Sequence, residues 1–465
     1  GPGHDGYFGG NRLRKCEEFM NFPLLVRVLA KRRQLAQHDQ WTRRQLEHHQ
    51  TKALERLRAY AYAKSPFYQK FHKGLEQQPL SELPVLTKAM MMEAFDTFVT
   101  DPNVHLKDVE SYLTTSSNEP FLGRYWVSAT SGSTGRRGIF LYNLSEWTTV
   151  IASYARVYAW GGINAGLTRQ SKIALVSTTT PWHQSARVGA SVQSPFVPTL
   201  RLDATQPLGE TIAALNKFQP EALVAYASVG RLLALAQLEG QLEIAPHSVF
   251  TSSEVLTEES RSLIAKAWGK PPMNVYAATE TATIAAECEY RVGMHFFEDL
   301  VITEVVDDQY RPVPPGEYGE KIFVTVLFSR TQPLIRYEMS DSIRLTDEIC
   351  PSGKPYALID GIQGRHEEVL PLPTPSGETV AIHPNVFHDV LDLIPTGGWQ
   401  VILEPTGLRL LLVGVRNRDD ELKLLSALRE SLTAHGVNVP PLFIAWVEAI
   451  PRSAVGKTPL IKSTL

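Results

Sequence analysis

ALVAY, at Ala222–Tyr226, and SVFTS, at Ser248–Ser252, are two short apolar runs that alternate with helical patterns along residues 208–268. The helical patterns cover 208–218, 229–238 and 258–268, and a third apolar run, SKIALVS at 171–177, precedes them. Short apolar runs of this kind predict strands, and their alternation with helices predicts a largely parallel sheet covered on both faces.

Outward from this segment the patterning changes. Residues 20–75 have apolar positions at three- and four-residue spacing, which predicts helices. Residues 299–347 contain strand patterns separated by Pro/Gly turns, which predicts a β-rich subdomain on the same body. After Gly364, strand and helix patterns suit a compact unit of ~100 residues. We therefore predict an α/β fold: a large domain of mixed, mostly parallel sheets over 1–363, and a small α+β domain over 364–465.

Composition excludes several classes of protein. The 465 residues are 43% hydrophobic and 20% charged, which is ordinary for a globular enzyme and too apolar for a disordered chain. A net charge of −3 provides no basic field for nucleic acid or an anionic membrane. No run of about 18 apolar residues occurs, which argues against a membrane span. Three cysteines and the lack of a signal-peptide pattern lead us to expect a cytoplasmic protein.

The first motif that carries chemistry is TSGSTGRRG at Thr130–Gly138. Small hydroxyl residues and glycines in this density form a loop whose backbone N–H groups can surround phosphate oxygens. The alternative is a surface Ser/Gly turn. The loop is not a Walker motif, because no Gly-Lys-Ser/Thr follows at the required spacing.

Four further motifs follow in order. YAATE at Tyr276–Glu280 offers an aromatic ring, a hydroxyl and a carboxylate, or alternatively a strand that ends in a helix cap. PLIRYEMSD at Pro333–Asp341 places a carboxylate after a strand, where it suits ribose hydroxyls; taken alone, Arg336 and Asp341 suit a surface ion pair. GRHEE at Gly364–Glu368 lies at the change in composition, and PRSAVGK at Pro451–Lys457 lies near the C-terminus. Each signal is weak by itself.

The order and spacing of these five motifs resemble those of the adenylate-forming superfamily of acyl-CoA ligases, over residues 50–460. Within it, the chain looks most like the phenylacetate–CoA ligase-like branch, in the helical segment 54–71, in LPVLTK at 83–88, and around Cys288 and His295. The resemblance implies an AMP-forming acid–thiol ligase that uses ATP, Mg²⁺ and CoA.

The resemblance also implies roles for individual residues. The phosphates would be held by Thr130, Ser131, Gly132, Ser133, Thr134 and Gly135. Tyr276 would pack on adenine, Thr279 would reach the α-phosphate, and Glu280 would hold Mg²⁺. Asp341 would bind the ribose with Arg365 near the nucleotide, Glu367 would be the hinge, and Lys457 would be the mobile catalytic lysine.

Relatives of this branch can carry a structural zinc, and the resemblance places its ligands at Cys288, His295 and Cys350. The fourth position reads Ser352 where the family has a cysteine, and serine is a poor zinc ligand. Retention and loss of the metal are both open at this point.

By position, the acyl pocket should draw on Trp182, His183, Tyr226, Ser228, Ser253 and Ala277. Planar walls from Trp182 and Tyr226 favour an aromatic acid. The alternative is that both rings are ordinary core aromatics.

Three functions follow from the resemblance. The first is an acid–CoA ligase, with an aromatic acid as the expected substrate. The second keeps the adenylate but passes the acyl group to a carrier-protein thiol or an amine. The third is a degenerate acyl-binding protein without ATP chemistry, for which the altered loop residues Arg137 and Gly138 are the best argument.

Overall fold

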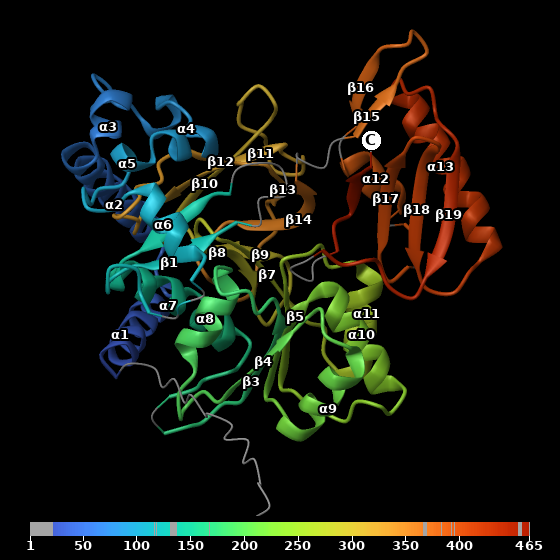
Figure 1. The fold of residues 1–465 in the computed structure, drawn as a ribbon, viewed down its shortest axis with the longest axis horizontal. Coiled ribbons are helices and arrows are strands. Elements are labelled where there is room, and N and C mark those ends of the chain that lie inside the picture. The colour runs from blue at the N-terminus through green and yellow to red at the C-terminus, as the bar shows by residue number, and fades with distance from the viewer. Residues whose placement is uncertain are drawn as a thin grey trace, which may run out of the picture.

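The computed structural model describes residues 22–464, except for 116, 118, 131–136, 167, 366–369, 383, 392, 395 and 454–457. Its largest element is a nine-stranded sheet in the order β13-β14-β9-β8-β7-β6-β5-β3-β4 (Figure 1). The strands are β3 (Ile173–Ser177), β4 (Thr199–Asp203), β5 (Ala222–Tyr226), β6 (Ser248–Ser252), β7 (Met273–Ala278), β8 (Ala282–Glu287), β9 (Met294–Phe296), β13 (Asp341–Thr346) and β14 (Leu358–Arg365).

The predicted mixed α/β fold is confirmed, but the parallel part of this sheet is confined to β4, β3, β5, β6 and β7. From β7 onward the neighbouring strands are antiparallel. The reason lies in the connection: only residues 279–281 separate β7 from β8, and a parallel crossover needs a dozen residues or more.

The helices beside the parallel strands are α8 (Gln184–Val192), α9 (Leu208–Phe218), α10 (Ala227–Leu238) and α11 (Glu258–Trp268). Local chemistry sets their ends. In α11 the Thr257 side chain accepts a hydrogen bond from the Ser260 amide, and Gly269 adopts the left-handed conformation (φ 77°) that terminates the helix. The predicted boundaries of α9 and α11, and of β5 and β6, agree with the structure.

The predicted N-terminal helices are α1 (Phe22–His38), α2 (Arg43–Lys64) and α3 (Pro66–Phe71). They are followed by a 3-10 turn (Leu80–Glu82) and by α4 (Lys88–Glu93), α5 (Phe95–Phe98) and α6 (Leu106–Leu113). A hairpin of β1 (Trp126–Ala129) and β2 (Ile139–Tyr142) precedes the long helix α7 (Leu144–Trp160). Within the predicted β-rich segment 299–347, a small antiparallel sheet is formed by β10 (Val301–Val306), β11 (Lys321–Val326) and β12 (Tyr337–Met339). The last strand of the segment, β13, joins the nine-stranded sheet instead.

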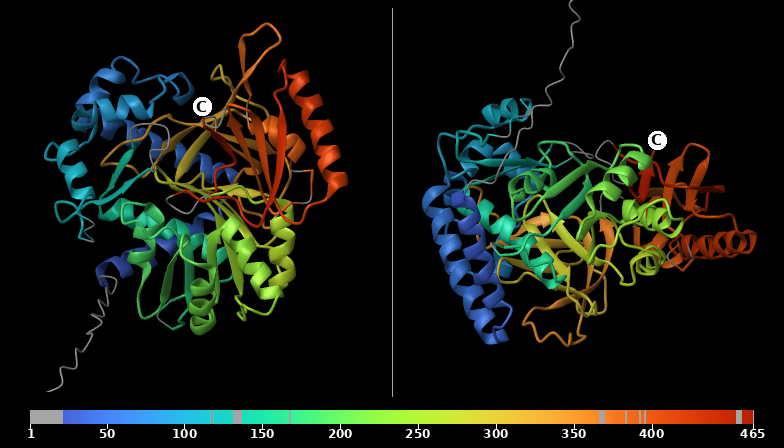
Figure 2. Two further views of the ribbon diagram at one scale, coloured as in Figure 1. Left: turned by 45° about the vertical axis from the view of Figure 1, so that its right-hand side comes forward. Right: turned by 90° about the horizontal axis from the view of Figure 1, so that it is seen from below.

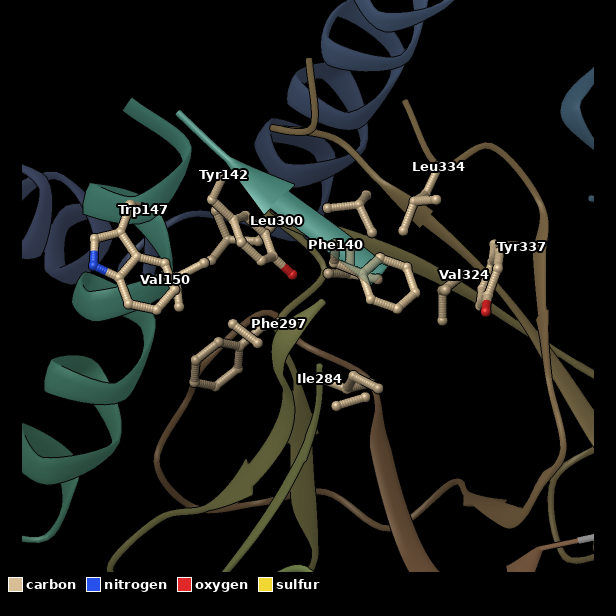
Figure 3. Packing of buried hydrophobic residues seen from close by; sticks show 14 of the residues in the cluster. Phe140, Tyr142, Trp147, Val150, Ile284, Phe297, Leu300, Val324, Leu334 and Tyr337 are labelled. Atoms are coloured by element: carbon tan, nitrogen blue, oxygen red, sulfur yellow. The ribbon is translucent and has the colours of Figure 1, made fainter. Parts of the chain in front are cut away.

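The core of this body is a continuous hydrophobic cluster that joins the hairpin, α7 and both sheets. Figure 3 shows Phe140 and Tyr142 of β2 between Trp147 of α7 and the side chains Ile284 and Val324 of the two sheets. A second cluster packs α9, α10 and α11 against the parallel strands. The strand ends that carry the candidate site are thus fixed by packing on both faces.

The C-terminal elements have a separate hydrophobic cluster, in which Leu428 is fully buried and Trp399 is 1% exposed. They lie beside α10 and α11 (Figures 1 and 2). They are β15 (Leu370–Pro373), β16 (Thr379–Ile382), α12 (Pro384–Leu391), β17 (Trp399–Glu404), β18 (Gly407–Val413), α13 (Arg418–Ala434), β19 (Leu442–Val447) and β20 (Ile461–Ser463). Among the described helices, none combines the length and apolar composition that crossing a membrane requires.

Candidate active site

The candidate site begins at the carboxyl ends of β5, β6 and β7. The register pairs Tyr226 with Ser252, and Ser252 with Val275, so Tyr226, Ser253 and Tyr276 follow one another along a single edge. Ligands of open α/β sheets bind at this edge, because parallel strands all end there. Tyr226, Ser253, Tyr276 and Ala277, which the sequence assigned to binding, are therefore placed at neighbouring strand ends.

Thr279 and Glu280 lie in the turn between β7 and β8. The carbonyl oxygen of Thr279 accepts hydrogen bonds from the Tyr142 hydroxyl and, at 3.0 Å, from the Gln184 side-chain amide. Burial and then the charge of Glu280 raise the pKa of Tyr142 well above its ordinary value, so the hydroxyl stays a donor. The alternative interpretation of this motif as a helix cap is wrong, because an antiparallel strand follows the turn.

The described ends of the predicted phosphate-loop motif, Thr130 and Gly138, directly follow β1 and directly precede β2. At its base the Thr130 amide donates to the Gly138 carbonyl at 2.9 Å, and the Gly138 amide donates to the Thr130 hydroxyl at 2.9 Å. Ser131, Gly132, Ser133, Thr134 and Gly135 lie outside the described residues. The Ala129 amide donates to the Trp182 carbonyl at 2.9 Å, so the base of the loop adjoins Trp182.

The two aromatic side chains predicted to line the acyl pocket differ in their surroundings. Trp182 is half-buried, and the Arg137 guanidinium lies 4.4 Å from its ring centroid in a cation–π contact. Tyr226 is 1% exposed, and its hydroxyl accepts a hydrogen bond from the Thr178 amide at 3.0 Å. The ring of Tyr226 is thus part of the core. Trp182 lies beside the β1–β2 hairpin instead.

Two other predicted pocket residues lie at helix starts. His183 precedes α8, and its Nδ1 lies 2.9 Å from the Ser185 hydroxyl. Ser228 is in the first turn of α10 and lines a cavity between that helix and the C-terminal elements. Its amide donates to the Glu254 carboxylate at 2.9 Å. Its place in an acyl pocket stays a prediction.

Asp341 begins β13 and is 6% exposed, and its cross-strand partner is Arg365 at the end of β14. Arg336 makes a bidentate pair with Glu304 instead, at 3.0 and 3.1 Å. The interpretation of Arg336 and Asp341 as a surface ion pair is therefore wrong, because Arg336 is itself buried against another carboxylate. Glu367 and Lys457 lie outside the described residues.

Cys288, His295 and Cys350 are buried, and their ligand atoms lie within 4.8 Å of one another. The two Sγ atoms are 3.5 Å apart, and Ser352 Oγ lies 3.4 Å from His295 Nε2. Burial lowers the pKa of His295 to about 4, so its imidazole is neutral at neutral pH. Its Nδ1 is buried and has no hydrogen-bond partner among the described residues. Two thiols and an imidazole are ligands that zinc takes, and Ser352 stands where a fourth ligand would lie.

Sequence reasoning missed Tyr142, Gln184 and Glu254, which hold the strand edge in place. Gln184 directly follows Trp182 and His183, and Glu254 directly follows Ser253, so adjacency to a predicted pocket residue was the available signal for both. Tyr142 lies in no motif, and only the fold brings it to the site.

No protein-family model matches the chain. In sequence it is 26% identical over 359 residues to phenylacetate–coenzyme A ligase of Thermus thermophilus, which covers 74% of this chain and 75% of that protein. It is also 29% identical over 254 residues to Protein CapK of Staphylococcus aureus, covering 52% of each. The predicted resemblance to the phenylacetate–CoA ligase-like branch is confirmed.

The fold is similar to that of a solved acyl-CoA ligase. 2-Hydroxyisobutyryl-CoA ligase in its postadenylation state, in complex with 2-HIB-AMP, matches with a TM-score of 0.68 at 19% identity over 88% of each chain. The same ligase in its thioesterification state matches with a TM-score of 0.59 over 92% of this chain and 91% of that one. The adenylate-forming ligase fold thus extends over both the body and the C-terminal elements.

Proposed function

We propose that the protein activates a small carboxylic acid with ATP as an acyl-adenylate and then transfers the acyl group to the thiol of CoA. The observation that carries the proposal is one juxtaposition. The base of the phosphate loop at Thr130, the Trp182 segment and the Thr279–Glu280 turn are linked by hydrogen bonds at the carboxyl edge of a parallel sheet. Similarity over three quarters of phenylacetate–coenzyme A ligase supports the same chemistry.

The physical problem is the approach of two anions, because the substrate carboxylate must attack a phosphate. Positioning and positive charge therefore supply most of the acceleration. In the proposed site, Thr130–Gly135 hold the terminal phosphates and Tyr276 packs on adenine. Asp341, near Arg365, accepts hydrogen bonds from the ribose hydroxyls. Thr279 orients the α-phosphate, and Glu280 would hold Mg²⁺, which offsets charge on the leaving pyrophosphate.

Residues 364–465 act, in this proposal, as a mobile unit that carries Lys457. Their hydrophobic cluster is separate from that of the body, which supports independent movement. Lys457 bridges the substrate carboxylate and the α-phosphate during adenylation, and rotation about Glu367 then withdraws it and admits the thiol.

The substrate we propose is a small aromatic acid. Trp182 and the strand-end residues Ser253 and Ala277 would form the pocket walls, with His183 at its entrance. The name of the Thermus thermophilus relative, a phenylacetate ligase, is consistent with an aromatic ring.

We also propose that Cys288, His295 and Cys350 hold a structural zinc, with Ser352 or water at the fourth position. The 3.5 Å separation of the two Sγ atoms and the 3.4 Å separation of Ser352 Oγ and His295 Nε2 support it, because ligand atoms around one tetrahedral zinc lie at about these separations. Protein purified without chelator should contain about one zinc per chain, and Cys288→Ser should lose it. A wild-type protein without metal under these conditions would contradict the assignment.

The function is tested by a pyrophosphate-release screen over aromatic and aliphatic acids, followed by an acceptor assay. We expect release with at least one aromatic acid and formation of its CoA thioester. If pyrophosphate is released but the acyl group ends on an amine or a carrier protein, the acceptor is that group and not CoA. No release with any acid, together with no ATP binding by calorimetry, would favour an acyl-binding protein without ATP chemistry.

A further inference from the structure

A single carboxylate joins the body to the residue that follows Lys457. Glu254 lies just after β6, next to Ser253, whose backbone is left-handed (φ 68°). One oxygen of Glu254 accepts a hydrogen bond from the Ser228 amide at 2.9 Å. The other accepts from the Thr458 amide at 2.7 Å and from the Thr458 hydroxyl at 3.0 Å. The strand edge, the start of α10 and the C-terminal segment therefore meet at one side chain.

The chemistry of this contact requires an acceptor-only group. All three partners donate, and two of them are backbone amides, which only a substitution to proline would remove. An ionised carboxylate has two acceptor oxygens and no donor, and hydrogen bonds to it are stronger than those to a neutral group. Glutamine would have the same shape but would present an N–H₂ to one set of donors.

The contact lies within a wider interface. The Arg452 guanidinium donates to the Ala204 carbonyl, and the Ser260 hydroxyl donates to the Gly397 carbonyl at 3.3 Å. These contacts hold the C-terminal elements against α11 and against the residue that follows β4. Arg452 and Gly397 are further along the chain from Lys457 than Thr458 is. Glu254 differs because its partner, Thr458, is the next residue in the sequence.

We propose that Glu254 is a positioning residue for the adenylation half-reaction. It holds the segment that carries Lys457 at the carboxyl edge of the sheet, and the contact must break when the C-terminal unit rotates for thioester formation. This inference rests on the proposed function. It predicts that loss of Glu254 lowers the rate of adenylation and leaves the second half-reaction intact, because only the first needs the lysine in place.

The experiment compares Glu254→Gln with Glu258→Gln, a control whose side chain is 82% exposed in the first turn of α11. Pyrophosphate release at saturating ATP measures the first half-reaction, and thioester formation from supplied acyl-adenylate measures the second. Glu254→Gln should slow pyrophosphate release by about tenfold or more, the scale of a lost hydrogen bond to a charged group. Thioester formation from the adenylate should keep the wild-type rate, and Glu258→Gln should match wild type in both. Thr458→Val, which removes only the hydroxyl contact, should cause a smaller loss of the same kind.

A readout besides activity separates this inference from the proposed function. Tryptic cleavage after Lys457, followed by mass spectrometry of the peptide that starts at Thr458, should be faster in Glu254→Gln than in wild type and Glu258→Gln. Equal cleavage rates, or equal loss in both half-reactions, would overturn the positioning role. If wild type released no pyrophosphate with any acid, the proposed function would fail, and the cleavage comparison would still decide whether Glu254 holds the segment.

Discussion

The carboxyl ends of β5, β6 and β7 in the body and the C-terminal unit would serve the same reaction, yet they are stabilised in different ways. Tyr276 and Ala278 belong to the hydrophobic cluster that runs through the body, so the edge cannot move without disturbing that cluster. The C-terminal elements have their own cluster and meet the body through contacts such as those of Glu254 and Ser260. Polar contacts of this kind can be broken and remade at small cost, whereas a packed core cannot. This difference in packing suits the proposed function, in which the body would bind the nucleotide and the C-terminal unit would move.

The largest effect is expected from the buried charges that stabilise the body. Asp299 is fully buried and accepts hydrogen bonds from Arg156 at 2.9 and 2.5 Å, while His38 Nδ1 lies 2.7 Å away. Asp299→Asn would leave Arg156 buried without its closest counter-charge, and such a loss destabilises by about 3–5 kcal/mol. Calorimetry should show a lower transition temperature for the body. Asp307→Asn removes the partner of an exposed arginine and should change little. An unaltered transition in Asp299→Asn would contradict the argument.

The same carboxylate makes stability depend on pH. Burial opposes its ionisation, but Arg156 and the hydrogen bonds from Arg156 and His38 outweigh burial and hold the pKa of Asp299 well below its ordinary value. A carboxyl whose pKa is lower in the folded state than in the unfolded state stabilises the fold at any pH above its unfolded pKa of about 3.9. This stabilisation is lost as the pH falls from the unfolded pKa through the folded pKa. The stability advantage of wild type over Asp299→Asn should therefore be constant near neutral pH and shrink below about pH 4. Denaturation curves of both proteins across this range measure it, and an advantage that grows toward acid would have the wrong sign.

A core substitution in the C-terminal unit tests whether its stability is separate. Leu428 of α13 is fully buried in that unit's cluster, and Leu→Ala at such sites costs about 2–5 kcal/mol. Only the C-terminal transition should move in calorimetry, and the transition of the body should stay in place. Leu422→Ala, in the same helix but 66% exposed, is the matched control. If both transitions shift together in Leu428→Ala, the two clusters unfold as one unit.

Lys457 should matter to one half-reaction only. Lys457→Ala should slow adenylation by at least ~10², the scale of losing one contact to developing negative charge. Thioester formation from supplied adenylate should continue. Lys462→Ala, at an exposed position in β20, is the control for loss of a nearby charge. Pyrophosphate release at the wild-type rate in Lys457→Ala would show that another group carries this role.

The same contrast explains what could be predicted from the sequence. β5, β6, α9 and α11 were predictable because each has its own periodic pattern and end signals. The antiparallel course of β8 was not, because it follows from the short connection at 279–281, and the strand ends that define this connection became visible only in the structure. The order of the five motifs led to the ligase branch. The partners of Thr279 and Thr458 could not be foreseen, since Tyr142 is 137 residues from Thr279, and Glu254 is 204 residues from Thr458.

The smallest effect on adenylation is expected from a substitution at Gly397, where the C-terminal unit meets Arg231 of α10. A Cβ on Gly397 would lie 1.6 Å from Nε of Arg231, whose guanidinium is paired with Glu259 at 3.0 and 2.9 Å. Gly397→Ala should therefore displace the Arg231 side chain and loosen the interface. Because a flexible side chain can yield, the cost should fall near the low end of the roughly 1–3 kcal/mol of overpacking, which slows adenylation by about fivefold. Gly209→Ala, where a Cβ meets nothing within 4 Å, is the control. An equal slowing of thioester formation would mean that the substitution damages the fold and not the docked arrangement, since only adenylation needs the C-terminal unit held against α10.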